Sequence, residues 1–333
     1  MKQWALIIVL GIASSLTAQV TDKDLRQPPG DDWLSYHGSY DSQRHSVLDQ
    51  IKLSNVGSLV SKWVYHLPGA GGLQSVPIVV NGVMYVTQPN EIYALDGRSG
   101  RLIWRYQHIL AKAPDREGPN RGAAVFEDKV YVTTTDSFLI ALNAADGNVL
   151  WQSKIAEASD GYHSPAAPLV AKGKVVVGVT YGDRGLNGFL DAFDAETGEH
   201  RWRFHSIPKP DEPGGDTWAG DSWQHAGGAT WLTGSYDPTL DTLYWPTGNP
   251  YPDYGDLERP GDNLYTNCML ALNPADGSLK WYFQFTPHDL HDWDSTEPPV
   301  VVDARFHGED RKLLLHGNRS SYRIQPGTIT VTE

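Results

Sequence analysis

Cysteine is almost absent from this chain of 333 residues, and acidic groups outnumber basic ones. The single cysteine, Cys268, excludes an intrachain disulfide, a four-cysteine metal site and a haem attached through a CxxCH motif. The chain has 27 Lys and Arg residues against 40 Asp and Glu residues, a formal net charge of −13. That charge argues against nucleic acid and anionic membrane surfaces as partners.

The apolar run that opens the chain is too short to span a membrane comfortably. Residues 1–18 begin with Met1-Lys2, continue with this run and end in small residues at Ala18. Such an order is typical of a secretory signal peptide. We therefore expect export to the bacterial periplasm without membrane insertion, with one mature domain over residues 19–333. An uncleaved anchor is the alternative.

Glycine, proline and aromatic residues are abundant, with 33 Gly, 22 Pro, 12 Trp and 16 Tyr. Gly and Pro at short intervals, together with many aromatic residues, favour an all-β architecture over a helical one. The length is sufficient for a sizeable hydrophobic core.

A short pattern recurs along the chain, in which a Gly-containing turn is followed by a Trp. Four copies end at Trp104, Trp151, Trp202 and Trp281, and a weaker fifth copy runs from Leu53 to Trp63. Each copy predicts a strand, a tight turn that needs Gly, and a second strand that ends in Trp. The recurring position indicates that these Trp side chains fill the space between neighbouring repeats.

A further hairpin is predicted upstream of the first copy, where Asn81-Gly82 separates two apolar runs. One repeat is then four short antiparallel strands. Four strands in a period of about 40–50 residues are typical of propeller blades. We therefore predict an all-β chain, a β-propeller of four-stranded antiparallel blades with about four to five blades and an incomplete ring.

Three stretches interrupt the repeats. Residues 205–224 and 249–267 are rich in Pro and Gly and predict long loops, where function usually collects on a repeat scaffold. Residues 287–294 hold three carboxylates and two imidazoles beside Trp293, and we expect them on a loop at the rim of the β-structure. A last unit begins at residues 299–302 and 312–316 and is not completed.

From about Asp32 to Arg319 the chain resembles the PQQ-dependent (quinoprotein) alcohol dehydrogenases. This is an eight-bladed propeller family that includes methanol and ethanol dehydrogenases. The resemblance covers roughly the N-terminal half of a family member. The matching segments are, in chain order, residues 32–36, 120–122, 227–231, 248–250 and 287–289.

The resemblance implies a set of cofactor-binding residues for PQQ, a quinone with three carboxylates. Arg121 matches the residue that pairs with a PQQ carboxylate, which suits a guanidinium fork. Trp231 matches the indole on which the quinone ring lies. Thr134 falls near a hydroxyl that also bonds the cofactor, Gln74 stands where the family has a Glu, and Arg319 resembles an Arg near the quinone oxygens.

The resemblance also implies a metal ion beside the quinone. Asn249 matches an amide-oxygen ligand, and Asp183 stands where the family has a ligating Glu. Asp292 matches the carboxylate that acts as ligand and as general base toward the alcohol. Asp294 supplies an extra carboxylate that is found in lanthanide-dependent members. It therefore favours a lanthanide ion, and Ca²⁺ is the alternative.

The chain departs from the family pattern at several positions. Residues 116–119 replace an adjacent-cysteine pair, Pro165 replaces a Thr that would donate to the cofactor, and the pattern is lost after Arg319. Three further residues of the acidic stretch are expected to shape the loop rather than to react: His288, Asp289 and His291.

The expected function is PQQ-dependent oxidation of a primary alcohol to the aldehyde. Because the chain has no haem cysteines, electrons would pass to a separate acceptor such as a c-type cytochrome, and the negative charge would favour a basic partner. A homodimer is left open. Two other readings stand beside this one: a truncated product without activity, and a non-enzymatic periplasmic propeller scaffold.

Overall fold

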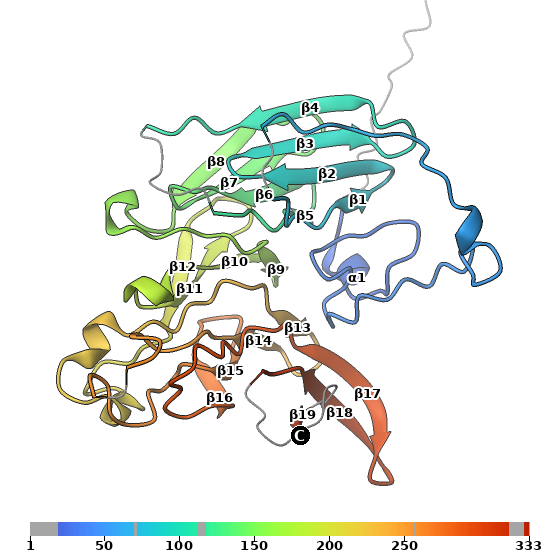
Figure 1. Ribbon diagram of the computed structural model, residues 1–333. Helices are drawn as coiled ribbons and strands as arrows, with labels where there is room; N and C mark the ends of the chain where they lie inside the picture. The colour runs from blue at the N-terminus through green and yellow to red at the C-terminus, as the bar shows by residue number, and fades with distance from the viewer. Residues whose placement is uncertain (1–18, 70–71, 112–117, 256, 320–329, 333) are drawn as a thin grey trace, which may run out of the picture.

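The computed structural model describes residues 19–69, 72–111, 118–255, 257–319 and 330–332. Strands β1–β19 form five antiparallel sheets, each built from strands that are consecutive in the chain. The sheets follow one another around an arc, and in the described part of the chain they do not close into a ring (Figure 1). The all-β prediction and the four-stranded blades are confirmed.

The first sheet contains β1 (Ile78–Val80), β2 (Val83–Gln88), β3 (Glu91–Asp96) and β4 (Leu102–Gln107). The second contains β5 (Ala124–Phe126), β6 (Lys129–Thr133), β7 (Phe138–Asn143) and β8 (Val149–Lys154). The third contains β9 (Leu169–Ala171), β10 (Lys174–Gly178), β11 (Phe189–Asp194) and β12 (His200–His205). The fourth contains β13 (Ser235–Asp237), β14 (Thr242–Pro246), β15 (Cys268–Leu272) and β16 (Leu279–Gln284). The last contains β17 (Val300–Phe306), β18 (Glu309–His316) and β19 (Thr330–Thr332).

The predicted Asn-Gly hairpin joins β1 to β2. Val80 pairs with Val83 across a two-residue turn, in which Asn81 and Gly82 have φ angles of 52° and 77°. Two successive positive φ angles are the geometry that matches the twist of a tight hairpin, and Asn and Gly adopt it most readily. The local sequence therefore sets the register of these two strands.

Each recurring Trp lies opposite a small residue on the neighbouring strand of its own sheet. Trp104 pairs with Ala94 and Trp151 pairs with Ala141, and a register shift follows the Ala in each case. The shift is a β-bulge, which increases the local twist of the strand pair. The same pairing and shift occur at Trp202 with Ala192 and at Trp281 with Ala271.

The indole then packs on the next sheet. Trp104 Nε1 donates to the carbonyl of Ala144 at 3.0 Å, and a Cβ on Gly147 would lie 2.6 Å from the Trp104 ring. Only glycine leaves room for that contact, and its φ of +75° is also one that glycine adopts without strain. The contact recurs between Trp151 and Gly198 and between Trp202 and Gly277.

The weak fifth copy forms no strand, so that part of the prediction is wrong. Residues 53–63 contain only the 3₁₀ turn η1 (Val56–Ser58) and belong to no sheet in the described part of the chain. Trp63 nevertheless docks as its counterparts do. Its Nε1 donates to the Gly97 carbonyl at 3.1 Å, and its ring lies against Gly100.

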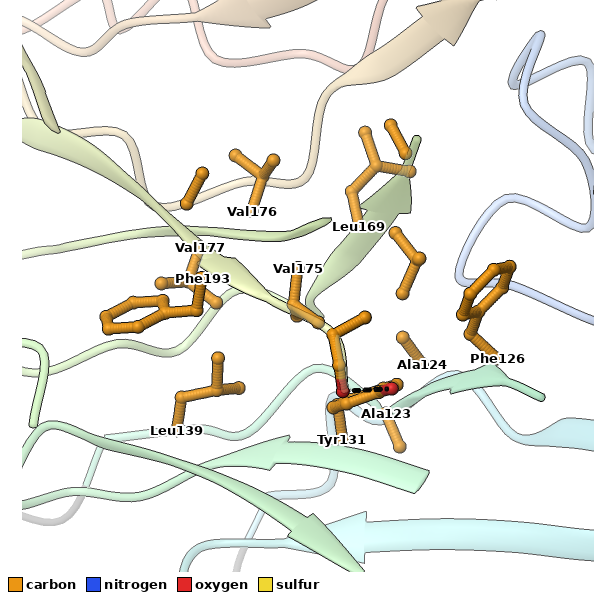
Figure 2. Packing of buried hydrophobic residues seen from close by; sticks show 14 of the residues in the cluster. Ala123, Ala124, Phe126, Tyr131, Leu139, Leu169, Val175, Val176, Val177 and Phe193 are labelled. Carbon is orange, nitrogen blue, oxygen red and sulfur yellow. Dashed lines mark hydrogen bonds between the residues drawn. The ribbon is translucent and has the colours of Figure 1, made fainter. Parts of the chain in front are cut away.

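The main core lies between adjacent sheets. A sheet with a neighbour on either side has inner strands that are buried on both faces: in the second sheet, all five residues of β6 are buried. The outer strands β4 and β12 are instead mostly exposed, and each has one buried side chain, Trp104 or Trp202. Figure 2 shows part of this core, in which Leu139 and Tyr131 of the second sheet pack near Val175 and Phe193 of the third.

The segment that contains α1 (Asp22–Leu25) crosses the inner edges of several sheets (Figure 1). The backbone contacts are Val20 with Glu127, Trp33 with Val79, Tyr40 with Tyr236, and Asp41 with Val301. The predicted signal peptide, residues 1–18, lies outside the described residues, so the domain boundary stays a prediction. No helix in the described ranges is both long enough and apolar enough to cross a membrane.

Both predicted long loops are confirmed. The connection after β12 contains only the short 3₁₀ turns η4 (Gly215–Thr217) and η5 (Ser222–His225), and the described part of the β14–β15 connection contains no helix or strand. Two other 3₁₀ turns, η2 (Ala158–Asp160) and η3 (Gly182–Arg184), lie in shorter connections.

We predict that Gly147→Ala destabilises the protein more than Gly173→Ala does. Both glycines have positive φ angles, so each substitution has a backbone cost of about 1–2 kcal/mol. A Cβ at Gly173 meets nothing within 4 Å, whereas one at Gly147 must displace Trp104. Overpacking of this kind costs about 1–3 kcal/mol more. Urea unfolding of the two variants measures the difference, and equal losses would contradict the docking argument.

Candidate functional site

The blade topology brings the predicted site residues to one end of the sheets. In an antiparallel sheet of consecutive strands, the segment before the first strand and the connection between the second and third strands lie at the same end. All the predicted site residues are in one of these two kinds of segment. They are Gln74, Arg121, Thr134, Asp183, Trp231, Asn249, Asp292, Asp294 and Arg319.

Arg121 is held by the residues on either side of it. Asn120 Nδ2 donates to the Thr133 carbonyl at 3.0 Å, and Asn120 Oδ1 accepts from the Gly122 amide at 3.0 Å. The Arg121 amide donates to the Pro165 carbonyl of the next blade at 3.0 Å. The Asn-Arg-Gly motif therefore fixes the backbone from which the guanidinium projects.

The Arg121 guanidinium lies over the Trp231 ring, with its carbon 4.8 Å from the ring centroid. The buried Thr230 fixes the backbone directly before Trp231. Its N–H donates to the Val179 carbonyl at 2.9 Å, and its hydroxyl donates to the Phe189 carbonyl at 2.6 Å. Burial lowers the pKa of Arg121 from its ordinary value. A flat apolar ring with a positive charge at its face suits a planar ligand that carries carboxylates.

A group of carboxylates lies at the same end. Burial raises the pKa of Asp294 to about 7, and the charges of Asp292 and Asp183 add to the increase. Burial and the Asp183 charge also raise the pKa of Asp292. The backbone N–H of Asn249 donates to Asp294 Oδ1 at 3.2 Å, so the residue that carries the predicted amide ligand contacts this group through its backbone. The structure therefore brings Asp183, Asn249, Asp292 and Asp294 into one electrostatic neighbourhood.

Backbone hydrogen bonds join these carboxylates to the Trp231 segment. Gly228 N donates to Asn249 O at 2.8 Å, and Gly248 N donates to Ala229 O at 2.8 Å. Residues 228–229 directly precede Thr230 and Trp231. The predicted ring-binding surface and the predicted metal ligands are thus two parts of one site.

Asp253 belongs to the same group, although the sequence reasoning did not identify it. Its Oδ1 accepts from Asn249 Nδ2 at 3.0 Å. Burial raises its pKa to about 6, with further contributions from Asp183 and Asp292. The available signal was an acidic residue four positions after Asn249 inside the predicted loop 249–267. A loop prediction does not say where the residue points.

Arg319 lies beside the carboxylates. Its Nη2 is 3.7 Å from Asp294 Oδ2 and donates to the Asp292 carbonyl at 3.3 Å. The side chain is 56% exposed. The charge of Arg319 opposes the increase in the pKa of Asp292 and of Asp294 without cancelling it. Its predicted position near the quinone oxygens stays a prediction.

The acidic loop is held in shape by Asp289. This side chain is only 1% exposed, and its carboxylate accepts from Asn267 Nδ2 and from the amides of His291 and Trp293 at 2.8–2.9 Å. Its contacts agree with the loop-shaping role expected of it. The loop also carries local strain, because Asp292 has a φ of 57° in the left-handed region.

Two predicted cofactor residues have no described contact with the rest of the group. Gln74 is exposed, although Val76, two residues later, donates its amide to the Arg121 carbonyl at 2.9 Å. The Thr134 hydroxyl is engaged in its own turn, where it donates to Asp136 Oδ1 at 2.5 Å and accepts from the Phe138 amide. The cofactor contacts of both residues stay predictions.

The donor chemistry of the group fits a hard cation. Carboxylate and amide oxygens are the ligands that Ca²⁺ prefers, and a lanthanide ion is also hard. Within the described ranges, no three His, Cys, Asp or Glu side chains are already arranged so that they could hold a metal ion. The amide oxygen of Asn249 is a further donor of the type required. A bound polyvalent cation would reduce the mutual repulsion of these carboxylates.

Comparison with known proteins shows what this chain is similar to. The family model for the PQQ glucose/ethanol/alcohol dehydrogenase β-propeller domain matches residues 33–322. Quinohemoprotein alcohol dehydrogenase ADH IIB of Pseudomonas putida is 37% identical over 93% of this chain and 48% of its own length. The lanthanide-dependent methanol dehydrogenase of Methylorubrum extorquens is 35% identical over 85% of this chain and 51% of its own length.

The crystal structure of quinohemoprotein alcohol dehydrogenase from Comamonas testosteroni superposes with a TM-score of 0.83 and 34% identity. The match covers 90% of this chain and 48% of that one. The chain thus spans about half the length of the curated relatives that it matches.

We predict that Asp294→Asn stabilises the metal-free protein at high pH only. Because the folded-state pKa of Asp294 is raised to about 7, while an unfolded Asp titrates near about 3.9, the ionised carboxylate disfavours the folded state. The folded state is therefore most stable below pH ~4, where Asp294 is protonated in both the folded and the unfolded state. This stability is lost as the pH rises toward 7 and Asp294 ionises. The variant should gain a few kcal/mol, at most about 4 kcal/mol, at pH 8 and nothing at pH 4.

Urea unfolding at the two pH values measures this difference, with Asp211→Asn, an exposed carboxylate outside the site, as the matched control. A stabilisation by Asp294→Asn that is equal at pH 4 and pH 8 would refute the electrostatic explanation.

Proposed function

This chain belongs to the PQQ-dependent alcohol dehydrogenase β-propeller family, and from that membership we propose that it oxidises a primary alcohol to the aldehyde with PQQ and a bound metal ion. The observation that carries the proposal is the meeting of two features at one end of the blades. One is the cation–π pair of Arg121 and Trp231. The other is the carboxylate group around Asn249.

The residues of this site have three proposed roles: binding PQQ, holding the cation and accepting the proton of the alcohol. Trp231 offers the surface on which the PQQ ring would lie, and Arg121 would pair with one of its carboxylates. Asn249, Asp183 and Asp294 would hold the cation through oxygen atoms. When bound, PQQ and its metal ion supply the redox and Lewis-acid chemistry.

Asp292 is the residue that would receive the proton of the alcohol hydroxyl. Its pKa is raised above the ordinary value of a carboxylic acid, by burial first and by Asp183 second. A higher pKa makes a carboxylate a stronger base while it stays ionised near neutral pH. Asp183 and Asp289 carry the neighbouring charges that raise the pKa of Asp292, and Arg319 limits the increase.

The number of carboxylates supports one choice of cation. Asp294 adds one negative charge and one more hard oxygen donor beside Asn249. A trivalent ion gains more from that charge than a divalent ion does, since the attraction scales with the product of the charges. We therefore propose a lanthanide ion, with Ca²⁺ as the alternative.

The proposed setting is the periplasm, with a separate electron acceptor such as a c-type cytochrome. The net charge of −13 would attract a basic partner. The joining of Arg121, Trp231, Asn249 and Asp294 in one site favours a dehydrogenase over a non-enzymatic scaffold, which has no need of that set.

We expect Asp292→Asn to abolish dye-linked alcohol oxidation by the protein reconstituted with PQQ and La³⁺ or Ca²⁺. The amide keeps the shape of the side chain but cannot accept the proton, and loss of a general base costs about 100- to 10,000-fold in rate. Absorbance of the bound quinone should be retained. Asp211→Asn, which removes an exposed charge outside the site, is the control. Turnover that survives in Asp292→Asn would show the proton acceptor to be another group.

We expect Asp294→Ala to change the preference between metal ions. The variant removes one oxygen and one charge near the cation, so its activity with La³⁺ should fall by about tenfold more than its activity with Ca²⁺. Steady-state rates of wild type and variant with each ion give the ratio. If the activity with La³⁺ relative to Ca²⁺ is unchanged in the variant, Asp294 does not determine the preference for a lanthanide ion.

A further inference from the structure

The amide of Asn249 has a definite orientation in the site. Its Nδ2 donates to the Pro250 carbonyl at 3.2 Å and to Asp253 Oδ1 at 3.0 Å. A carbonyl and a carboxylate can only accept hydrogen bonds, so the amide nitrogen must face both of them. The oxygen Oδ1 then lies on the other side of the amide, and no hydrogen bond within the described ranges engages it.

Of these two bonds, the one to Asp253 has the greater orienting power. The bond to Pro250 joins adjacent residues, so it constrains the side chain only against its own backbone. The bond to Asp253 is shorter, spans four residues and has a charged acceptor, and such bonds are about twice as strong as neutral ones. Asn249 is itself only 2% exposed, so water has little access to take the place of Asp253.

The position of Asp253 is in turn fixed by the buried guanidinium of Arg259. Arg259 is fully buried, and its Nε and Nη2 both donate to the Pro252 carbonyl, at 3.0 and 2.8 Å. Its Nη1 donates to Asn263 Oδ1 at 2.9 Å, and its Nη2 also donates to the Asp289 carbonyl in the acidic loop. The peptide that leads into Asp253 is therefore tied to both loops that build the site.

We propose that Asp253 is a positioning residue that turns the Asn249 amide oxygen toward the bound cation by accepting the Asn249 Nδ2 hydrogen bond. The inference rests on the proposed function, because it assigns the cation to Asn249. Asp253 acts through its hydrogen bond and not as a metal ligand. Residues that orient a ligand in this way typically contribute about 10- to 100-fold to metal affinity.

A pair of substitutions separates orientation from charge. Asp253→Asn removes the charge but keeps a side-chain oxygen that accepts from Asn249 Nδ2, whereas Asp253→Ala removes both. If Asp253 acts by orienting the amide, the Asn variant keeps the cation affinity and the Ala variant loses it. If Asp253 acts as a charge or a ligand, the two variants lose affinity alike.

The measurement is a titration of the purified chain with Tb³⁺ alone, without PQQ or alcohol. Luminescence sensitised by nearby tryptophans, such as Trp231 and Trp293, reports occupancy of the site. We expect Asp253→Ala to weaken Tb³⁺ binding by at least about tenfold and Asp253→Asn to stay within about threefold of wild type. Asp262→Asn, an exposed carboxylate in the same loop, is the control for loss of charge. Urea unfolding confirms that each variant is folded.

Equal losses in Asp253→Asn and Asp253→Ala overturn the inference, and so does wild-type affinity in Asp253→Ala. Asn249→Ala separates this failure from failure of the proposed function. If Asn249→Ala binds Tb³⁺ weakly while Asp253→Ala binds normally, only the positioning role is wrong. If Asn249→Ala binds as wild type does, the proposed metal site itself is wrong.

Discussion

The packing of each blade's tryptophan on the next blade's turn glycine is the contact on which the rest of the structure depends. Trp104, Trp151 and Trp202 each place the indole ring where the following blade has a glycine with positive φ. A small Ala opposite each ring and a β-bulge beside it give the strand pair the twist that this contact requires. Each contact joins one sheet to the next, and the site segments lie at the same end of each sheet.

The site at that end is unfavourable by itself. Burial and the charges of Asp183 and Asp292 raise the pKa of both Asp253 and Asp294. A protein selected for stability alone has little reason to keep four carboxylates together with one exposed Arg319. Stability is given up locally where a cation can later restore it, a pattern typical of functional sites.

The cost is tolerated because the loops that carry these groups are rigidly supported. Asp289 binds the backbone of the acidic loop, and Arg259 ties that loop to the segment that contains Asp253. Both side chains are buried at the junction of the two loops. These bonds oppose the backbone movement that would let the like charges separate.

The sequence by itself determined the features that depend on neighbouring residues: the Asn81-Gly82 hairpin, the repeated strand pairs with their Trp, and the two long loops. Its resemblance to a known family supplied the predicted ligands, including Asn249. The tertiary structure alone decided that Asp253 joins them, that the Thr134 hydroxyl is engaged in its own turn, and that Trp63 docks without a strand. Turns and strand pairs form between residues close in the chain, so local propensities specify them. The direction of a loop side chain depends on contacts with distant segments, which are established only when the sheets pack.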